Sequence, residues 1–195
     1  MQSCRGDINR FMKSDNGKYG IFPEEVIGKA GKILKYTDFY CNAGETEYCI
    51  NNEKLAIPYR LYHNTAGTML LEFFEQGKIM SHCIGTRNHN GFVRQKHLKF
   101  LLEYEFLYWT VPYIIKICDE YVIQILEMVY AELSKRDTEI FKKFTAENPE
   151  MIGKCYGRMV SYWNAYYRYK YRNLKEYVGY KLFKEHFGYC IKHRF

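Results

Sequence analysis

After Asn64, apolar residues recur every three or four positions, which is the period of an α-helix that buries one face. Gly, Asn or Pro residues interrupt this pattern and divide it into segments of helical length. The segments are 69–84, 92–102, 111–118, 121–133, 139–144, 149–172 and 174–187. Together they predict a mainly α fold for residues 65–195.

Residues 1–64 follow a different pattern. Pro23 and the two glutamates after it predict the start of an amphipathic helix over 23–35. From 45 to 62, apolar and polar residues alternate on both sides of a polar turn, which predicts a β-hairpin. We expect this N-terminal region of an arm, a helix and a hairpin to precede repeat-like helices over 65–195 that form one compact unit.

Composition and motifs limit the class of protein. The chain has no apolar stretch long enough to span a membrane, and its N-terminal segment lacks the apolar core of a secretion signal. We therefore expect a cytoplasmic protein that makes no membrane contact.

The seven cysteines are an odd number, which favours reduced thiols over a disulfide framework. No CxxC, HExxH or HxxxH motif is present, so the sequence predicts no metal site and no cofactor.

Four of the cysteines are almost equally spaced. They stand at 83, 118, 155 and 190, separated by 35, 37 and 35 residues. Regular spacing of a small residue is typical of stacked helical hairpins, in which every repeat presents the same position to its neighbour. Coincidence among seven cysteines is the alternative.

A second pattern is independent of the cysteines. Segments 90–95 and 119–124 each place a polar residue before an aromatic residue, a valine and a glutamine. Asn90-Gly91-Phe92-Val93-Arg94 resembles the opening of the second helix in HEAT-type repeats, where Asp or Asn precedes Val-Arg. In the other segment Ile123 replaces the arginine. Over residues 66–134, the resemblance implies antiparallel helix pairs stacked into a curved solenoid that binds protein or nucleic acid along its concave face.

Residues 161–177, SYWNAYYRYKYRNLKEY, hold six tyrosines and one tryptophan. On a regular helix over 149–172, most of these rings share one wide arc. The arc contains Tyr162, Trp163, Tyr166, Tyr167, Tyr169 and Tyr171. A helix normally buries an arc of this kind, so we expect the rings in the core. The alternative, stacking on nucleic-acid bases, requires several of the rings to be exposed.

Positive charge is concentrated near the C-terminus. From Lys154 to Phe195 there are ten Lys or Arg residues against two acids, whereas the rest of the chain is close to neutral. Arg158, Arg168 and Arg172 lie on the remaining side of the predicted helix and form a basic face. Such a face either contacts phosphates or is ordinary solvated helix surface.

Another polar cluster lies between two predicted helices. Arg87, Asn88, His89 and Asn90, with Arg94 just beyond, are expected in an exposed loop whose last residue caps the next helix. The functional alternative makes His89 a general base or an anion ligand at the helix N-terminus.

Two further candidates for chemistry are weaker. Cys83 beside His82 suggests a nucleophile and a base, but neighbours on a helix point about 100° apart. Asp119 and Glu120 suggest a carboxylate site, yet the acids of this region spread around the helix, so a solvated edge is expected. The sequence therefore predicts no catalytic residue.

The sequence favours a non-enzymatic helical scaffold that binds a protein partner through its basic, tyrosine-rich C-terminal region. The contact residues predicted are Arg87, Asn88, His89, Asn90, Arg94, Arg158, Arg168 and Arg172. The alternative is a nucleic-acid-binding protein that uses the same cationic face. A third interpretation is a hydrolase that depends on Cys83 or His89. The oligomeric state stays open.

Overall fold

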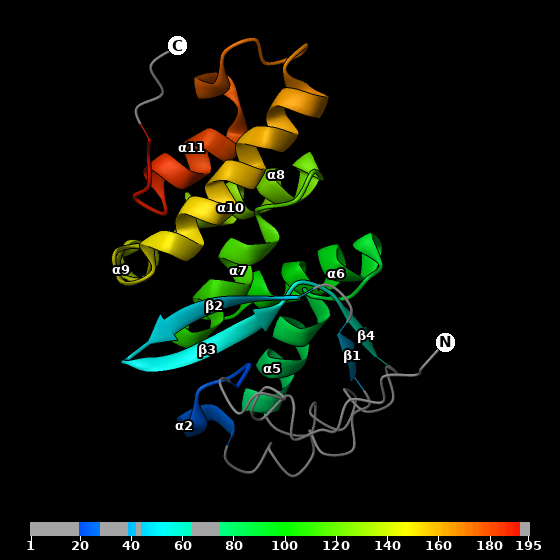
Figure 1. Ribbon diagram of the computed structural model, residues 1–195, viewed down its shortest axis with the longest axis vertical. Coiled ribbons are helices and arrows are strands. Elements are labelled where there is room, and N and C mark those ends of the chain that lie inside the picture. The colour runs from blue at the N-terminus through cyan, green and yellow to red at the C-terminus, as the bar shows by residue number, and fades with distance from the viewer. Residues whose placement is uncertain (1–19, 28–38, 42–43, 64–74, 192–195) are drawn as a thin grey trace. The chain divides into compact units, whose positions relative to one another are not determined.

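The computed structural model describes residues 20–27, 39–41, 44–63 and 75–191. The chain divides into two compact units, residues 1–105 and 106–195. The described part is mainly helical, as the apolar period predicts, and its strands all belong to the first unit (Figure 1). The boundary expected between residues 64 and 65 falls outside the described residues. Stacking of the helices into HEAT-type repeats stays a prediction.

The predicted β-hairpin is confirmed. β2 (Glu45–Ile50) pairs with β3 (Glu53–Pro58) in antiparallel register. Asn51 and Asn52 connect the strands with φ angles of 49° and 67°, the two positive values that a two-residue type I′ turn requires. Pro58 lies opposite Glu45 at the open end of the hairpin, where its missing N–H disturbs the ladder least.

A second strand pair was not predicted, and it takes Leu61 and Tyr62 from the end of the hairpin expected over 45–62. β1 (Phe39–Cys41) pairs with β4 (Leu61–His63) in antiparallel register. The N–H of Leu61 also donates to the carbonyl of Arg87 at 2.7 Å, and its carbonyl accepts from the N–H of His89 at 3.1 Å. The backbone of residues 87–89 is therefore hydrogen-bonded along β4.

The helices of the first unit agree with the predicted ones where they are described. α5 (Glu75–Gly85) and α6 (Gly91–Glu103) pack against each other (Figure 1). Asn90 caps α6, as predicted, because its side-chain oxygen accepts from the N–H of Phe92 at 3.0 Å. Near the N-terminus, α2 (Glu24–Ile27) opens the helix expected over 23–35, whose residues 28–35 lie outside the described part.

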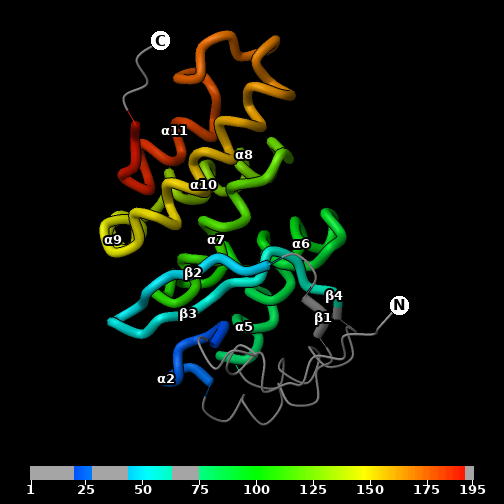
Figure 2. Tube along the Cα trace, viewed as in Figure 1, coloured from blue at the N-terminus to red at the C-terminus, as the bar shows by residue number. Residues whose placement is uncertain are grey.

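The second unit is a helical assembly. Its elements are η2 (Tyr108–Thr110), α7 (Val111–Ile117), α8 (Ile123–Leu133), α9 (Glu139–Glu147), α10 (Pro149–Tyr162), a π-helical turn η3 (Trp163–Tyr167), η4 (Leu174–Glu176) and α11 (Val178–Glu185). α11 lies beside α8 and α10 (Figure 2). Each of the five longer helices contributes buried apolar side chains to one core, among them Ile115, Leu126, Phe141, Ile152 and Leu182. No helix in the described ranges combines the length and the apolarity that crossing a bilayer requires.

The two last predicted helices are interrupted. α10 ends at Tyr162 and passes into η3, and the chain then turns instead of continuing as a helix to residue 172. The helix predicted over 174–187 is divided at Tyr177, whose extended backbone (φ −73°, ψ 134°) separates η4 from α11. Tyr177 itself is fully buried, so packing of its ring opposes a continuous helix.

The cysteine positions agree only partly with a repeat. Cys83, Cys118 and Cys155 are completely buried, whereas Cys190 is exposed. The helix that follows Asp119 begins at Ile123 with Val122 as its N-cap and without a side-chain cap. The two segments compared with HEAT-type openings therefore start their helices differently, since only the first uses its Asn as a cap.

Candidate functional site

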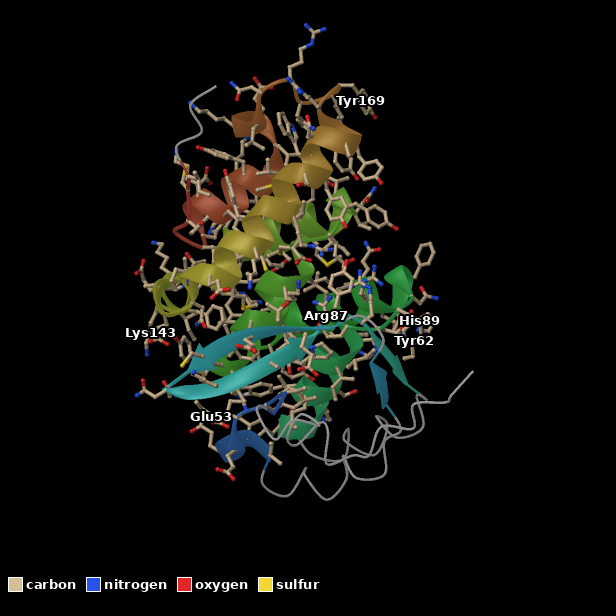
Figure 3. The ribbon with its side chains drawn as sticks, viewed as in Figure 1. Glu53, Tyr62, Arg87, His89, Lys143 and Tyr169 are labelled. Carbon is tan, nitrogen blue, oxygen red and sulfur yellow. The ribbon has the colours of Figure 1, made fainter. Side chains whose placement is uncertain are left out.

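The tyrosine-rich segment is the part of the second unit that departs furthest from expectation. Its rings were expected in the core, but Tyr166 is 55% exposed and Tyr169 is 83% exposed. Tyr162, Tyr167 and Tyr171 are half-buried, and among the rings of the predicted arc Trp163 is the one that is buried. Figure 3 labels Tyr169 at the turn that follows α10 and η3. The prediction of a buried arc is therefore wrong.

The physical reason is the change of helix type at Trp163. A helical wheel assumes a constant rotation per residue, and a π-helical turn alters that rotation. The indole N–H of Trp163 donates to the carbonyl of Tyr171 at 2.9 Å, which fixes the buried ring and folds the following residues back across it. The rings beyond Trp163 consequently leave the face that α10 buries.

We give the name tyrosine surface to Tyr121, Tyr162 and Tyr166, which are joined by ring contacts, together with Tyr169, which follows Tyr166 by three residues in the chain. Tyr121, itself 52% exposed, comes from the loop before α8, and the other three come from α10 and the residues after it. The ring centroids of Tyr121, Tyr162 and Tyr166 lie 6.0 to 6.1 Å from one another. This spacing and the tilts between the rings are typical of favourable aromatic pairs.

A hydrogen-bonded tyrosine holds the two parts of this surface together. The hydroxyl of Tyr167 donates to the carbonyl of Tyr121 at 2.6 Å and accepts from the N–H of Ile123 at 3.3 Å. The ring of Tyr167 stacks on the buried ring of Tyr177, with centroids 5.5 Å apart. The hydrogen bonds and the ring stacking of Tyr167 therefore fix the backbone segments that carry the exposed rings.

Cations accompany the tyrosine surface. Between Glu150 and Glu176 the chain contains no acidic residue. The cations of this segment are Lys154, Arg158, Arg168, Lys170, Arg172 and Lys175, and all except Arg158 are exposed. Arg168 donates to the side-chain oxygen of Asn164 at 3.1 Å and lies 5.8 Å from the Trp163 ring. The hydrogen bond to Tyr171 raises the pKa of Lys170, and the charge of Glu127 in α8 acts in the same direction.

Arg158 is held differently from Arg168 and Arg172, although the three were predicted to form one basic face. Its Nε atom lies 3.4 Å from a carboxylate oxygen of Asp119, and one Nη atom donates to the hydroxyl of Tyr162 at 3.3 Å. Asp119 also pairs with the buried ammonium group of Lys116. Arg158 is thus partly neutralised, whereas Arg168 and Arg172 reach solvent.

Asp119 and Glu120 were expected on a solvated helix edge, and this is also corrected. Both are buried in the turn between α7 and α8. A buried carboxylate is stable only when cations or hydrogen-bond donors compensate its charge, and Lys116 and Arg158 do so for Asp119. Asp119 and Glu120 are therefore part of the buried interior of the second unit.

In the first unit, the predicted contact residues separate into a buried and an exposed group. Arg87, Asn88 and Arg94 are buried, while His89 and Asn90 are exposed. One Nη atom of Arg94 donates to the carbonyls of Asn88 and His89, each at 2.9 Å. The expected exposed loop is instead an ordered connection, because β4 and Arg94 bind its backbone. The sequence pattern does not reveal which of these polar residues are buried and which are exposed.

The two residues of the hydrolase interpretation, Cys83 and His89, both belong to the first unit, and that interpretation stays a prediction. Cys83 is completely buried, and burial raises the pKa of its thiol well above the ordinary value, which opposes formation of the reactive thiolate. His89 is exposed and stacks on the ring of Tyr62, with centroids 4.8 Å apart (Figure 3). Cys83 and His89 therefore lie in different environments, one dry and one solvated.

Comparisons with protein-family models, with curated proteins and with solved structures found no match to this chain. The tyrosine surface, with Arg168, Lys170 and Arg172 beside it in the chain, combines exposed aromatic rings with exposed cations.

Proposed function

We propose that the second unit binds single-stranded nucleic acid through the tyrosine surface and the cations that follow it. The observation that carries this proposal is the exposure of Tyr121, Tyr166 and Tyr169 next to a segment rich in Lys and Arg and free of acids. Exposed rings interleaved with cations are the combination used by proteins that bind single strands without strict sequence preference.

Stacking explains why the ligand is a single strand. A base can stack on a tyrosine only if its own face is free, and in a duplex both faces are covered by neighbouring base pairs. Each base stacked on an aromatic ring contributes about 1–3 kcal/mol. The three most exposed rings of the tyrosine surface would thus account for a substantial affinity.

The cations supply the phosphate contacts. Arg168, Lys170 and Arg172 are exposed within five residues of one another, so they can follow a flexible phosphate backbone. Contacts of this kind release counterions, and each lowers the slope of log K against log salt by about 0.7 for a single strand. Three contacts therefore predict a slope of about −2.

The sequence favours a protein partner, and such a partner could contact the same side chains, since Tyr and Arg are frequent at protein interfaces. The acid-free run from 151 to 175 favours a polyanion over a protein surface of mixed charge. A partner recognised mainly by apolar contact would bind with little dependence on salt, which separates the two proposals.

The test is fluorescence anisotropy of the full chain with labelled oligouridine, oligothymidine and a blunt duplex, from about 50 to 200 mM salt. We expect both single strands to bind and the duplex to bind more weakly. The double variant Tyr166→Ala/Tyr169→Ala should lose tenfold or more in affinity, about 1.4 kcal/mol or more, at an unchanged salt slope. Tyr62→Ala, which removes an exposed ring of the first unit, is the matched control.

Arginine variants test the electrostatic part separately. Arg168→Ala/Arg172→Ala should reduce the steepness of the salt dependence by about 1.4, since two phosphate contacts are lost. Arg158→Ala should change the slope little because Asp119 already pairs with this guanidinium. Equal affinity of the tyrosine variant and the parent protein, or no binding of single strands at low salt, would refute the proposal.

A further inference from the structure

Two histidines of the first unit face each other where α5 packs against α6. The Nδ1 atoms of His82 and His97 lie 3.1 Å apart, and their ring planes are inclined by 55°. Fifteen positions separate the two residues in the chain, so a search for short histidine motifs passes over them.

Packing holds both rings in place. The ring of His82 stacks on Phe100, with centroids 5.2 Å apart, and Tyr104 lies 5.9 Å from it. At Gly85 an added Cβ would meet Cγ of His97 at 2.1 Å, so the His97 ring occupies the space that any larger residue would need. The two imidazoles are thus preorganised by the helices that carry them.

We propose that His82 and His97 bind one divalent transition-metal ion, with the two Nδ1 atoms as ligands. An ion at the usual Zn–N distance of about 2.05 Å from both nitrogens would subtend an angle of about 100° for their 3.1 Å separation. This value lies between the right angle of square-planar and octahedral ions and the tetrahedral angle that zinc prefers. The separation of the two Nδ1 atoms therefore matches that of two ligands on one ion.

The chemistry of the donors selects the class of ion. Imidazole nitrogen suits Zn²⁺, Ni²⁺ and Cu²⁺, whereas Mg²⁺ and Ca²⁺ require oxygen ligands. The described residues contain no group of three His, Cys, Asp or Glu side chains placed to share an ion. Among the described residues the two histidines supply two positions, and the proposal leaves the others to water or an outside ligand.

Protons compete with the ion for the same atoms. Without metal, one Nδ1 donates a hydrogen bond to the other; when the ion binds, that proton moves through solvent to Nε2 of the same ring, so both ligands are neutral imidazoles. A protonated imidazolium ring has no lone pair left for the ion. The affinity should therefore fall as the pH drops through the ordinary range of imidazole.

The experiment uses the full chain labelled with ¹⁵N and titrated with Zn²⁺. Long-range ¹H–¹⁵N spectra of the histidine rings should show metal ligation at Nδ1 of two residues, and calorimetry should give one site. His82→Gln and His97→Gln should each weaken Zn²⁺ binding by about tenfold or more. His89→Gln and Cys190→Ser, which remove an exposed imidazole and an exposed thiol, should leave this site intact.

Two histidine variants keep the test decisive if one of them folds poorly. The proposal is overturned if Zn²⁺ changes the spectrum of neither ring, or if a folded variant of His82 or His97 binds the ion as tightly as the parent. It is also overturned if His89→Gln or Cys190→Ser abolishes the binding. The site lies in the first unit, so these outcomes are independent of nucleic-acid binding by the second.

Discussion

The Nε atom of Arg158 lies 3.4 Å from the carboxylate of Asp119, a group that no solvent reaches. Asp119 also pairs with Lys116, one helical turn earlier and equally enclosed. Through Tyr162, which accepts a hydrogen bond from Arg158, the buried charges are linked to the exposed tyrosine surface. An ionic cluster in the interior thereby supports the candidate binding surface.

Removing one member of the buried pair should be far more harmful than removing both. Asp119→Ala removes the carboxylate that pairs with the buried ammonium group of Lys116, which should cost about 3–5 kcal/mol of folding free energy. The double variant Lys116→Met/Asp119→Leu replaces both charges by apolar groups and should recover most of this loss. Urea unfolding followed by circular dichroism measures both values. Equal destabilisation by the single and double variants would contradict the role of paired charge.

Two glycines of the second unit should respond to alanine in opposite directions. At Gly179 an added Cβ would meet Met159 and Tyr177 at 2.8 Å, so Gly179→Ala should destabilise the unit by about 1–3 kcal/mol. At Gly157, inside α10, an added Cβ meets nothing within 4 Å, and Gly157→Ala should stabilise by about 0.5–1 kcal/mol. Thermal unfolding of the two variants beside the parent provides the measurement, and shifts of the same sign would disprove the packing described at Gly179.

Tyr156 should make the second unit sensitive to alkali. Its burial raises the pKa of the phenol to about 12, from an ordinary value of 10.0. Between these two values the folded state keeps a proton that the unfolded state has lost, so stability is complete below pH 10 and declines as the pH rises toward 12. Unfolding free energies at pH 9, 10 and 11 should fall less steeply in Tyr156→Phe than in the parent. A variant with the parent's slope would show that another group dominates.

Local patterns were sufficient for the elements whose residues interact with near neighbours in the chain. The Asn51-Asn52 turn, the capping of α6 by Asn90 and the period of the helices after Asn64 all depend on contacts over a few residues. The distribution of charged residues along the sequence also showed that the cations gather near the C-terminus. These features follow from backbone sterics and hydrophobic periodicity, which a linear sequence displays directly.

Burial and convergence of distant residues could not be predicted in this way. Arg94 was identified as a contact residue, but its position beneath the backbone of Asn88 and His89 depends on β4, far away in the chain. The approach of His82 to His97 depends on the packing of two helices.

Tyr166 and Tyr169 became exposed because a π-helical turn moved them off the buried face of α10, which an ideal helical wheel cannot anticipate. Periodicity specifies which residues share a face of one regular element, whereas the neighbours of that face, and any break in the element, are set by packing between segments remote in sequence.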